Sequence, residues 1–127
     1  CAVGQANLEA LIKDGLIKNS QKLGKIFHQK LGKIKKRHPK IISDICGHGL
    51  LAAIIFTKGK ERKPLSKLCD AVAERTMQKG LLVVHTGRES IKLAPPLVIN
   101  EAALLEGLKV LEESIDEIIN EKPELAN

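Results

Sequence analysis

The sequence predicts an α+β fold, a small antiparallel-type sheet of three to four strands covered on one face by helices. Two observations predict helices: apolar residues recur at spacings of three and four in residues 16–37, and they do so again in residues 100–120. A third observation predicts the sheet: from Ile41 the pattern changes to short runs rich in β-branched residues, punctuated by glycine.

The first two predicted elements are helices. Residues 1–13 form the first, which Asp14-Gly15 ends, and residues 16–37 form the second. His38-Pro39 ends the second helix, because the residue before a proline is pushed out of the helical region. The inward stripe of the second helix comprises Leu23, Phe27, Leu31 and Ile34, widened by Ile17 and Ile26.

Two strands are predicted next, over residues 41–46 and 50–57, joined by Gly47-His48-Gly49. The two glycines are expected to serve the backbone conformation of a turn or bulge, which is favoured over phosphate binding because a lone Gly-x-Gly is a weak signal. A polar, basic loop follows over residues 58–64.

A third helix is predicted from Ser66, as its cap, to about Lys79, with Leu68, Val72 and Met77 turned inward. Gly80 ends this helix. The predicted order then continues with a strand over residues 81–84, a loop over 85–89, and a strand over 91–94 that Pro95-Pro96 stops.

The last predicted element is a helix that Asn100 caps. Its apolar stripe is the cleanest in the sequence and is interpreted as core, because it lasts barely two heptads and so does not favour a coiled coil. The stripe comprises Leu104, Leu108, Leu111, Ile115 and Ile118.

Composition limits the classes of protein that fit. With two Phe and no Tyr or Trp, the core of this 127-residue chain must be aliphatic. No apolar run reaches the about 20 residues that span a bilayer, so no membrane segment is expected. Cys1, Cys46 and Cys69 are odd in number and lack metal-ligand spacing, which favours reduced thiols in a cytoplasmic protein.

Charge is distributed unevenly along the chain. Residues 13–67 hold 15 Lys and Arg against 3 Asp and Glu, whereas residues 100–127 hold 2 against 8. This asymmetry indicates an interaction surface, two faces of the chain that lie against each other, or an absent partner.

The domain organisation is inferred from the start of the chain. The sequence begins at Cys1 in a helical pattern that no Ser, Thr, Asp or Asn precedes as a cap. We therefore expect one domain, residues 1–127, that is the carboxy-terminal fragment of a longer enzyme. Its parts are a helical lead-in (1–38), a sheet with one helix (41–99) and a final helix (100–120).

Three segments are distinctive in their order and spacing: residues 44–51 (DICGHGLL), 78–83 (QKGLLV) and 91–99 (IKLAPPLVI). Together they resemble the carboxy-terminal small domain of the class III aminotransferases, pyridoxal-phosphate enzymes of fold type I. The resemblance covers nearly the whole chain. It implies a domain that contributes recognition of the substrate carboxylate and closure of the active site to an upstream catalytic domain.

The resemblance also implies the cofactor and the partners. The parent enzyme would use pyridoxal 5'-phosphate to move an amino group from an amino donor to a 2-oxo acid, and it would be a homodimer. No catalytic, cofactor-binding or metal-binding residue is assigned here, because no lysine of this chain has the family's catalytic context. The fragment is expected to bind no cofactor and to be inactive alone.

Three residues are candidates for substrate binding. In many members of the family, the residue before Leu-Ala-Pro-Pro is an arginine that binds the substrate's α-carboxylate, and the matching residue here is Lys92. A lysine supplies the charge without the two parallel hydrogen bonds of a guanidinium. Arg88 is a candidate to compensate, against an ordinary loop charge, and His48 to face the active-site entrance, against an exposed turn residue. Lys92 itself has the alternative of a surface lysine on an edge strand.

Two further interpretations are open but not favoured. Cys46, His48 and His85 suggest zinc, but their spacing matches no standard closed site. The basic run 33–40 suggests a nucleic-acid-binding module, but no aromatic platform accompanies it, so a solvated helix face or an interface with an acidic neighbour is preferred. A purely structural, dimer-supporting module is the remaining alternative.

Overall fold

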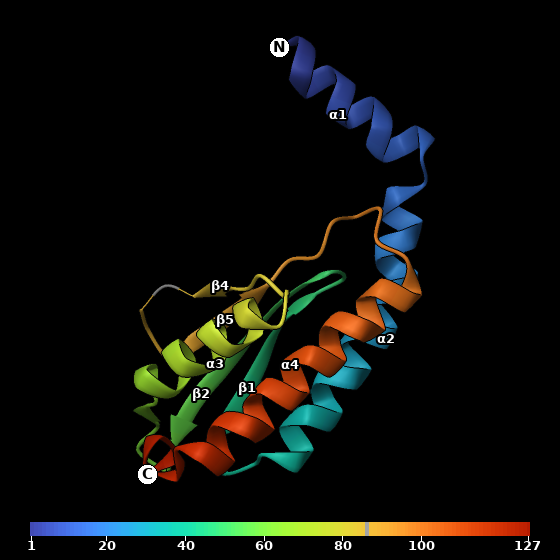
Figure 1. The fold of residues 1–127 in the computed structure, drawn as a ribbon. Helices are drawn as coiled ribbons and strands as arrows, with labels where there is room; N and C mark the ends of the chain where they lie inside the picture. Colours follow the sequence, from blue (N-terminus) through green and yellow to red (C-terminus); the bar gives the residue numbers. More distant parts are fainter. Residues whose placement is uncertain (86) are drawn as a thin grey trace.

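The computed structural model describes residues 1–85 and 87–127. Its elements are α1 (Ala2–Lys13), α2 (Leu16–Arg37), β1 (Ile42–His48), β2 (Leu51–Lys58), β3 (Lys63–Pro64), α3 (Ser66–Gln78), β4 (Val84–His85), β5 (Ser90–Leu93), α4 (Glu101–Glu121) and a 3-10 helix, η1 (Pro123–Ala126). Helices α2, α3 and α4 lie on one side of the sheet, while α1 projects away from the rest (Figure 1). The predicted α+β fold is therefore confirmed.

The sheet is antiparallel throughout, in the order β1-β2-β5-β4, with β3 paired to β2 outside that path. The β1–β2 turn depends on glycine, because Gly47 and Gly49 have φ values of 128° and 58°. A Cβ on Gly47 would lie 2.1 Å from the Leu51 carbonyl oxygen. The conformational role predicted for these two glycines is confirmed.

The core lies between the sheet and the helices and is aliphatic, as expected, apart from two phenylalanines. Its buried side chains include the predicted stripes of α2 and α4 and one face of the strands. Phe27 and Phe56, the two aromatic residues, are both buried, at 1% and 0% exposure. Ile54 and Ile91 are cross-strand partners in β2 and β5, and both are fully buried.

The helix ends agree with most of the local signals. Gly15, with φ 64°, separates α1 from α2, and α2 ends at Arg37 before His38-Pro39. Asn100 caps α4, because its Oδ1 accepts a hydrogen bond from the Ala103 N–H at 2.8 Å. Gly80, with φ 87°, follows α3, where Leu81 N–H donates to the Thr76 carbonyl at 2.8 Å.

Three predictions about the helices are wrong. Helix α3 begins at Ser66 but has Leu65 as its N-cap, and Ser66 makes no capping hydrogen bond. The physical reason is that buried Leu65 donates its N–H to the Phe56 carbonyl at 3.0 Å, which fixes the entry to the helix. Met77 is 57% exposed rather than turned inward, and Ile17 is likewise 57% exposed rather than part of the buried stripe of α2.

The strand boundaries also differ from prediction. Of the strand predicted over residues 81–84, only Val84 is paired, in β4. The predicted loop 58–64 contains β3, whose Pro64 lies opposite Thr57. The loop predicted over residues 85–89 includes Thr86, which lies outside the described residues.

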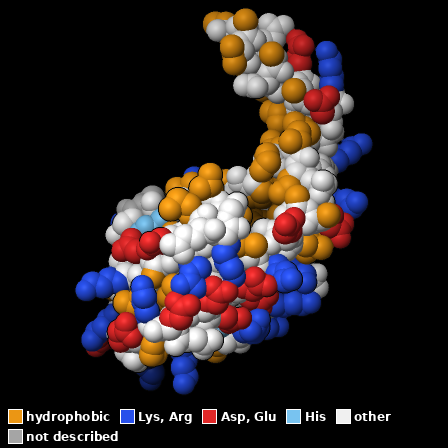
Figure 2. Space-filling view, viewed as in Figure 1, with side chains coloured by type: hydrophobic (Ala, Val, Ile, Leu, Met, Phe, Trp, Pro, Cys, Tyr) orange, Lys and Arg blue, Asp and Glu red, His pale blue; other side chains and the backbone are white. Residues whose placement is uncertain are grey.

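Helix α1 is the least covered element. None of its 12 residues, all of them described, is buried, and Val3, Leu8 and Ile12 are 76%, 63% and 75% exposed. Figure 2 shows apolar side chains gathered along this end of the molecule, whereas charged side chains of both signs cover the opposite end. Within the part of the chain that the structure describes, no helix combines the length and the apolar character needed to cross a membrane.

Candidate functional site

Lys92 lies in β5, where side chains alternate between the two faces of the sheet. Its neighbours Ile91 and Leu93 are buried, at 0% and 8% exposure, and point toward the helices. Lys92 is exposed and therefore points to the other face, which these helices do not cover. The strand thus holds the backbone of Lys92 firmly while its ammonium group reaches into the open.

The immediate surroundings of Lys92 are small and apolar. Its cross-strand partners are Val84 in β4 and Ala53 in β2, and Ala53 in turn pairs with Cys46 in β1. These residues share the uncovered face because cross-strand partners point the same way. Among the ion pairs of the described residues, none includes Lys92. Its charge is therefore available to an anionic ligand.

His48 is on the same face of the sheet as Lys92 but not beside it. It ends β1, is exposed, and pairs with Leu51. Two strand spacings across and two residues along place its Cα about 12 Å from that of Lys92. A ligand of ordinary length can reach both side chains, but they do not contact each other.

Unlike Lys92 and His48, Arg88 lies outside the strands and close to an acidic neighbour. It lies in the loop before β5, with its side chain 77% exposed and its Nε 3.5 Å from a Glu89 carboxylate oxygen. The Arg88 carbonyl oxygen lies 3.1 Å from the His85 Nε2, which fixes the backbone of this loop. The structure therefore pairs the Arg88 guanidinium with Glu89 rather than placing it beside Lys92.

The residues considered for zinc are on different faces of the sheet. Cys46 and His48 belong to the uncovered face. His85 pairs with Ile91, whose side chain is buried under the helices, and its Nδ1 lies 3.2 Å from Asp70 Oδ1 of α3. No group of three His, Cys, Asp or Glu residues within 1–85 and 87–127 is arranged to hold a metal ion.

The segment that follows Lys92 is fixed by a residue that the sequence did not single out. Asn19 of α2 donates from its Nδ2 to the carbonyls of Leu97 and Ile99, at 2.7 and 3.1 Å. Ile99 N–H donates to the Pro96 carbonyl at 2.9 Å, which closes a turn. Nothing in the local sequence of Asn19 signals this contact, because its partners lie 78 and 80 residues away.

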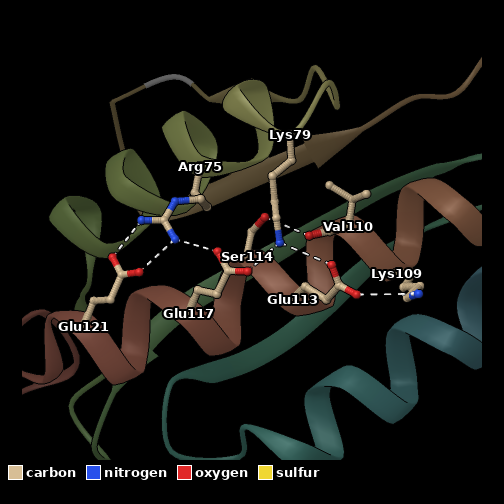
Figure 3. A network of polar contacts seen from close by, with 8 residues as sticks. All are labelled: Arg75, Lys79, Lys109, Val110, Glu113, Ser114, Glu117 and Glu121. Atoms are coloured by element: carbon tan, nitrogen blue, oxygen red, sulfur yellow. Dashed lines mark hydrogen bonds and ion pairs between the residues drawn. The ribbon is translucent and has the colours of Figure 1, made fainter.

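The charge asymmetry is explained in part by contacts within the chain. Figure 3 shows Arg75 of α3 and Lys79, the C-cap of α3, meeting acidic residues of α4. Arg75 donates to Glu117 at 2.5 Å and to Glu121 at 2.7 Å, and Lys79 donates to Glu117 at 2.5 Å. On the other side of α4, Arg37 of α2 pairs with Glu112 and Asp116. The acidic helix therefore lies between basic residues of its two neighbours.

These pairs also change proton affinities. Hydrogen bonds from Lys79 and Arg75 lower the pKa of Glu117, and the hydrogen bond from Arg75 lowers the pKa of Glu121. The same hydrogen bonds to Glu121 and Glu117 raise the pKa of Arg75. The network thus favours the charged forms and fixes α3 on α4.

Two residues of the basic run 33–40 also form ion pairs within the chain. Lys35 Nζ lies 3.7 Å from Asp44 Oδ1, and Arg37 is committed to α4. The two aromatic residues, Phe27 and Phe56, are buried and offer bases no surface to stack on. These observations favour a solvated helix face over a nucleic-acid interface.

Pyridoxal phosphate does not fit the residues of this chain. A fold type I cofactor site requires a lysine in an enclosed pocket, and among the described residues no lysine is buried. The cavity that includes Lys92 is otherwise lined by apolar residues, so it offers no acid to a pyridine nitrogen. We therefore derive no reaction step through the cofactor from this chain.

The elements define an α+β domain with helices on one side of an antiparallel sheet, and sequence comparison assigns its family. The profile of the family "Aminotransferase class-III" matches residues 1–115. Because this match covers most of the chain, the protein belongs to the class III aminotransferase family, whose members generally depend on pyridoxal phosphate.

Curated relatives agree with this assignment. The chain is 32% identical to the 5-aminovalerate aminotransferase of Pseudomonas aeruginosa over 121 residues, covering 93% of this chain and 28% of that protein. It is 33% identical to the ornithine aminotransferase of Emericella nidulans over 123 residues, covering 96% and 26%. The chain therefore spans little more than a quarter of the length of these relatives.

Solved structures show the same fold. A Bacillus anthracis aminotransferase matches with a TM-score of 0.82 at 28% identity, covering 93% of this chain and 28% of that one. The acetylornithine aminotransferase of Elizabethkingia anophelis matches with a TM-score of 0.78 at 32% identity, covering 92% and 28%. The resemblance identified from the three sequence segments is confirmed.

Proposed function

We propose that this chain is the small domain of a pyridoxal-phosphate-dependent class III aminotransferase, residues 1–127 forming one domain at the carboxy-terminal end of the enzyme. Its role is to recognise the substrate's carboxylate and to close the active site of a catalytic domain upstream. The observation that carries this proposal is Lys92, an exposed lysine without an ion pair in the described structure, directly before Leu93-Ala94-Pro95-Pro96.

The share of each relative's length that this chain matches supports a separate catalytic domain in the whole enzyme. This chain matches 28% of the 5-aminovalerate enzyme, so the remaining length is available for the cofactor site that this chain does not form. Pyridoxal phosphate supplies an electron sink for the carbanion chemistry of amino transfer when the whole enzyme holds it. The substrates of the whole enzyme would be an amino donor and a 2-oxo acid, and the chain alone would be inactive.

In this role Lys92 attracts and positions the carboxylate. Its ammonium is a compact charge on a flexible stem, so it binds the anion through charge and single hydrogen bonds. Val84 and Ala53 on either side carry no competing charge. Arg88 and His48 belong to the loop and the strand end that surround this face, and we propose them as outer contacts for a longer substrate.

Closure of the active site is assigned to the joint between α1 and α2. Gly15, with φ 64°, and the exposed Asp14 connect a helix that is not packed into the core to the rest of the domain. A joint of this kind permits α2 and the sheet to move relative to α1 when substrate binds. The exposed apolar residues Val3, Leu8 and Ile12 suit α1 for packing against the catalytic domain.

The carboxylate role is tested in the whole enzyme with Lys92→Met and Lys92→Arg. For an amino-acid donor, Lys92→Met should raise KM about tenfold or more, because a charge-assisted hydrogen bond is lost, and Lys92→Arg should retain binding. For an amine donor without a carboxylate, both variants should match the parent. Lys109→Met, which removes another exposed lysine, on α4, is the control. An equal rise in KM for both donors would contradict the proposal.

The assembly and location follow as further parts of the proposal. The whole enzyme would be a cytoplasmic homodimer, and the three free thiols are consistent with a reducing compartment. Light scattering on the purified enzyme gives the molar mass directly. A monomer at working concentration would remove the dimer from the proposal without affecting the role of Lys92.

A further inference from the structure

The hairpin formed by β2, β3 and the turn between them places two lysines directly opposite each other. Lys58 of β2 pairs with Lys63 of β3, so their side chains share a face, with Cβ atoms about 5 Å apart. Thr57, which precedes Lys58, is 7% exposed and points inward, so the two lysines point outward. Like charges directly opposite each other destabilise an antiparallel pair. This pair of strands therefore carries an electrostatic cost.

The turn of the same hairpin carries a second local cost. Among the described residues, Arg62 alone combines a side chain with a positive φ, of 53°. Its guanidinium pairs with Asp44 of β1 and donates to Ser43 Oγ at 3.4 Å. These contacts hold the bend and direct the Arg62 side chain toward β1. Unfavourable backbone conformations that a protein retains are concentrated at functional segments, so the hairpin is a candidate site.

A cavity of about 600 Å³ opens beside this hairpin. It is lined by residues 58–61 and 63–65 and by Asn127, at the carboxy-terminal end of the chain, which lies next to the end of β2 (Figure 1). Lys58 Nζ lies 3.3 Å from Asn127 Oδ1, which ties the two sides of the cavity together. The volume lies within the range of small-molecule sites, about 300–1,000 Å³.

The charges around the cavity are unbalanced. The lining side chains include three lysines, Lys58, Lys60 and Lys63, against one acid, Glu61. No ion pair within residues 1–85 and 87–127 includes Lys58 or Lys60. Lys63 Nζ is 3.9 Å from Glu61 Oε2, and the two side chains are 76% and 81% exposed, so this pair contributes little. The lining side chains therefore leave positive charge for a ligand to neutralise.

We propose that this cavity binds an oligophosphate through Lys58, Lys60 and Lys63. A lysine binds phosphate as a compact point charge, and three separate ammonium groups suit an anion that carries several charges. No aromatic residue lines the cavity, so the phosphates rather than a nucleobase are the recognised group. A bound anion would also offset the repulsion between Lys58 and Lys63, which links binding to stability. This inference goes beyond the proposed function and shares no residue with it.

The test is a titration of the 127-residue chain, labelled with ¹⁵N, with inorganic triphosphate in the absence of divalent metal ions. Amide shifts should change at residues 58–65. Affinity should fall from triphosphate to diphosphate to monophosphate, by up to about fivefold for each phosphate removed, the range of one exposed ion pair. ATP should bind about as tightly as triphosphate, and citrate, which carries fewer charges, should bind more weakly. Binding should weaken between 50 and 200 mM salt.

Three outcomes of the titration would overturn the proposal. Shifts spread along the lysines of α2 would indicate a nonspecific response to net charge. Equal affinity for monophosphate and triphosphate, or for citrate and triphosphate, would exclude an oligophosphate site. ATP that binds far more tightly than triphosphate would mean that the base is recognised. These readouts involve no amino transfer, so their failure and that of the KM test are distinguishable.

Variants separate the charge from the fold. Lys63→Gln should weaken triphosphate binding by up to about fivefold, yet raise the Tm of the free protein by up to about 4 °C, because the repulsion with Lys58 is removed. Lys60→Gln has no cross-strand partner in the hairpin, so it should weaken binding and leave Tm unchanged. Lys22→Gln, at an exposed position of α2, is the control and should change neither. An equal loss of binding in Lys22→Gln, or unaltered binding in both hairpin variants, would overturn the proposal.

Discussion

Gly24, in the middle of α2, lies directly against Gly49 in the turn between β1 and β2. A Cβ added to Gly24 would be 2.7 Å from the Gly49 Cα and 2.8 Å from its carbonyl carbon. Next to this contact, the Leu50 N–H donates to the Ser20 Oγ at 3.3 Å. The turn that carries His48 toward the uncovered face is thus seated on a helix across a contact between two glycines.

The contact predicts that Gly24→Ala destabilises the protein. The new methyl group meets backbone rather than a flexible side chain, so overpacking should cost about 1–3 kcal/mol in the free energy of unfolding. Gly32→Ala, in the same helix with nothing within 4 Å of its added Cβ, should instead stabilise by about 0.5–1 kcal/mol through helix propensity. Urea unfolding measures both variants, and a stabilised Gly24→Ala would show that the two elements can separate at no cost.

The same contact shows what the sequence can and cannot predict. The positive φ of Gly47 and Gly49 was predictable, because Gly-x-Gly between two β-rich runs is a local signal. Gly24 gave no such signal, since its partner lies 25 residues further along the chain. The stripes of α2 and α4 were predictable for the opposite reason, because one face of a helix repeats every three to four residues.

In the candidate site too, only the features with a local sequence signal were predictable. Lys92 was found because it precedes Leu93-Ala94-Pro95-Pro96, a pattern readable in one stretch of sequence. The contacts of Asn19 were not predictable, because its partners lie 78 and 80 residues away. The apolar cavity beside β5 was not predictable either, because it forms where α2, α4 and the segment 81–84 meet. His48 and Lys92 share a face through the pairing of three strands, and no local rule gives that register.

The network between α3 and α4 predicts an acid-sensitive part of the stability. The folded pKa values of Glu117 and Glu121 are lowered, so their contribution is complete above the unfolded value of about 4.3 and is lost as pH falls through the folded values. Arg75→Gln should lower stability at pH 7 and reduce the further loss between pH 5 and pH 3. Urea unfolding is the suitable measurement, because guanidinium chloride would screen the ion pairs.

Arg88→Gln is the matched control for Arg75, because its side chain is 77% exposed and its one ion pair among the described residues is with the neighbouring Glu89. It should change neither the stability at pH 7 nor its dependence on pH by a measurable amount. If Arg75→Gln shows the same loss between pH 5 and pH 3 as the parent, another group is responsible for the acid sensitivity.

The three thiols should differ sharply in reactivity. Cys1 and Cys46 are exposed, whereas Cys69 is buried in α3. Burial raises the pKa of the Cys69 thiol to about 12, and the charges of Asp70 and Glu89 add to the rise. At pH 8 only about one part in ten thousand of Cys69 is thiolate, the reactive form. Ellman's reagent should therefore titrate two thiols in the native protein and three in urea.

Asn19 holds the backbone that follows Lys92 and β5. Asn19→Ala removes both hydrogen bonds to the carbonyls of Leu97 and Ile99 and should cost about 1–2 kcal/mol of unfolding free energy. Asn7→Ala, at an exposed position of α1, makes the same chemical change without such partners and should be nearly neutral. Because the lost bonds hold this segment, amide exchange in residues 97–99 should accelerate selectively in Asn19→Ala. Uniform acceleration across the domain would mean that Asn19 supports the whole fold rather than this segment.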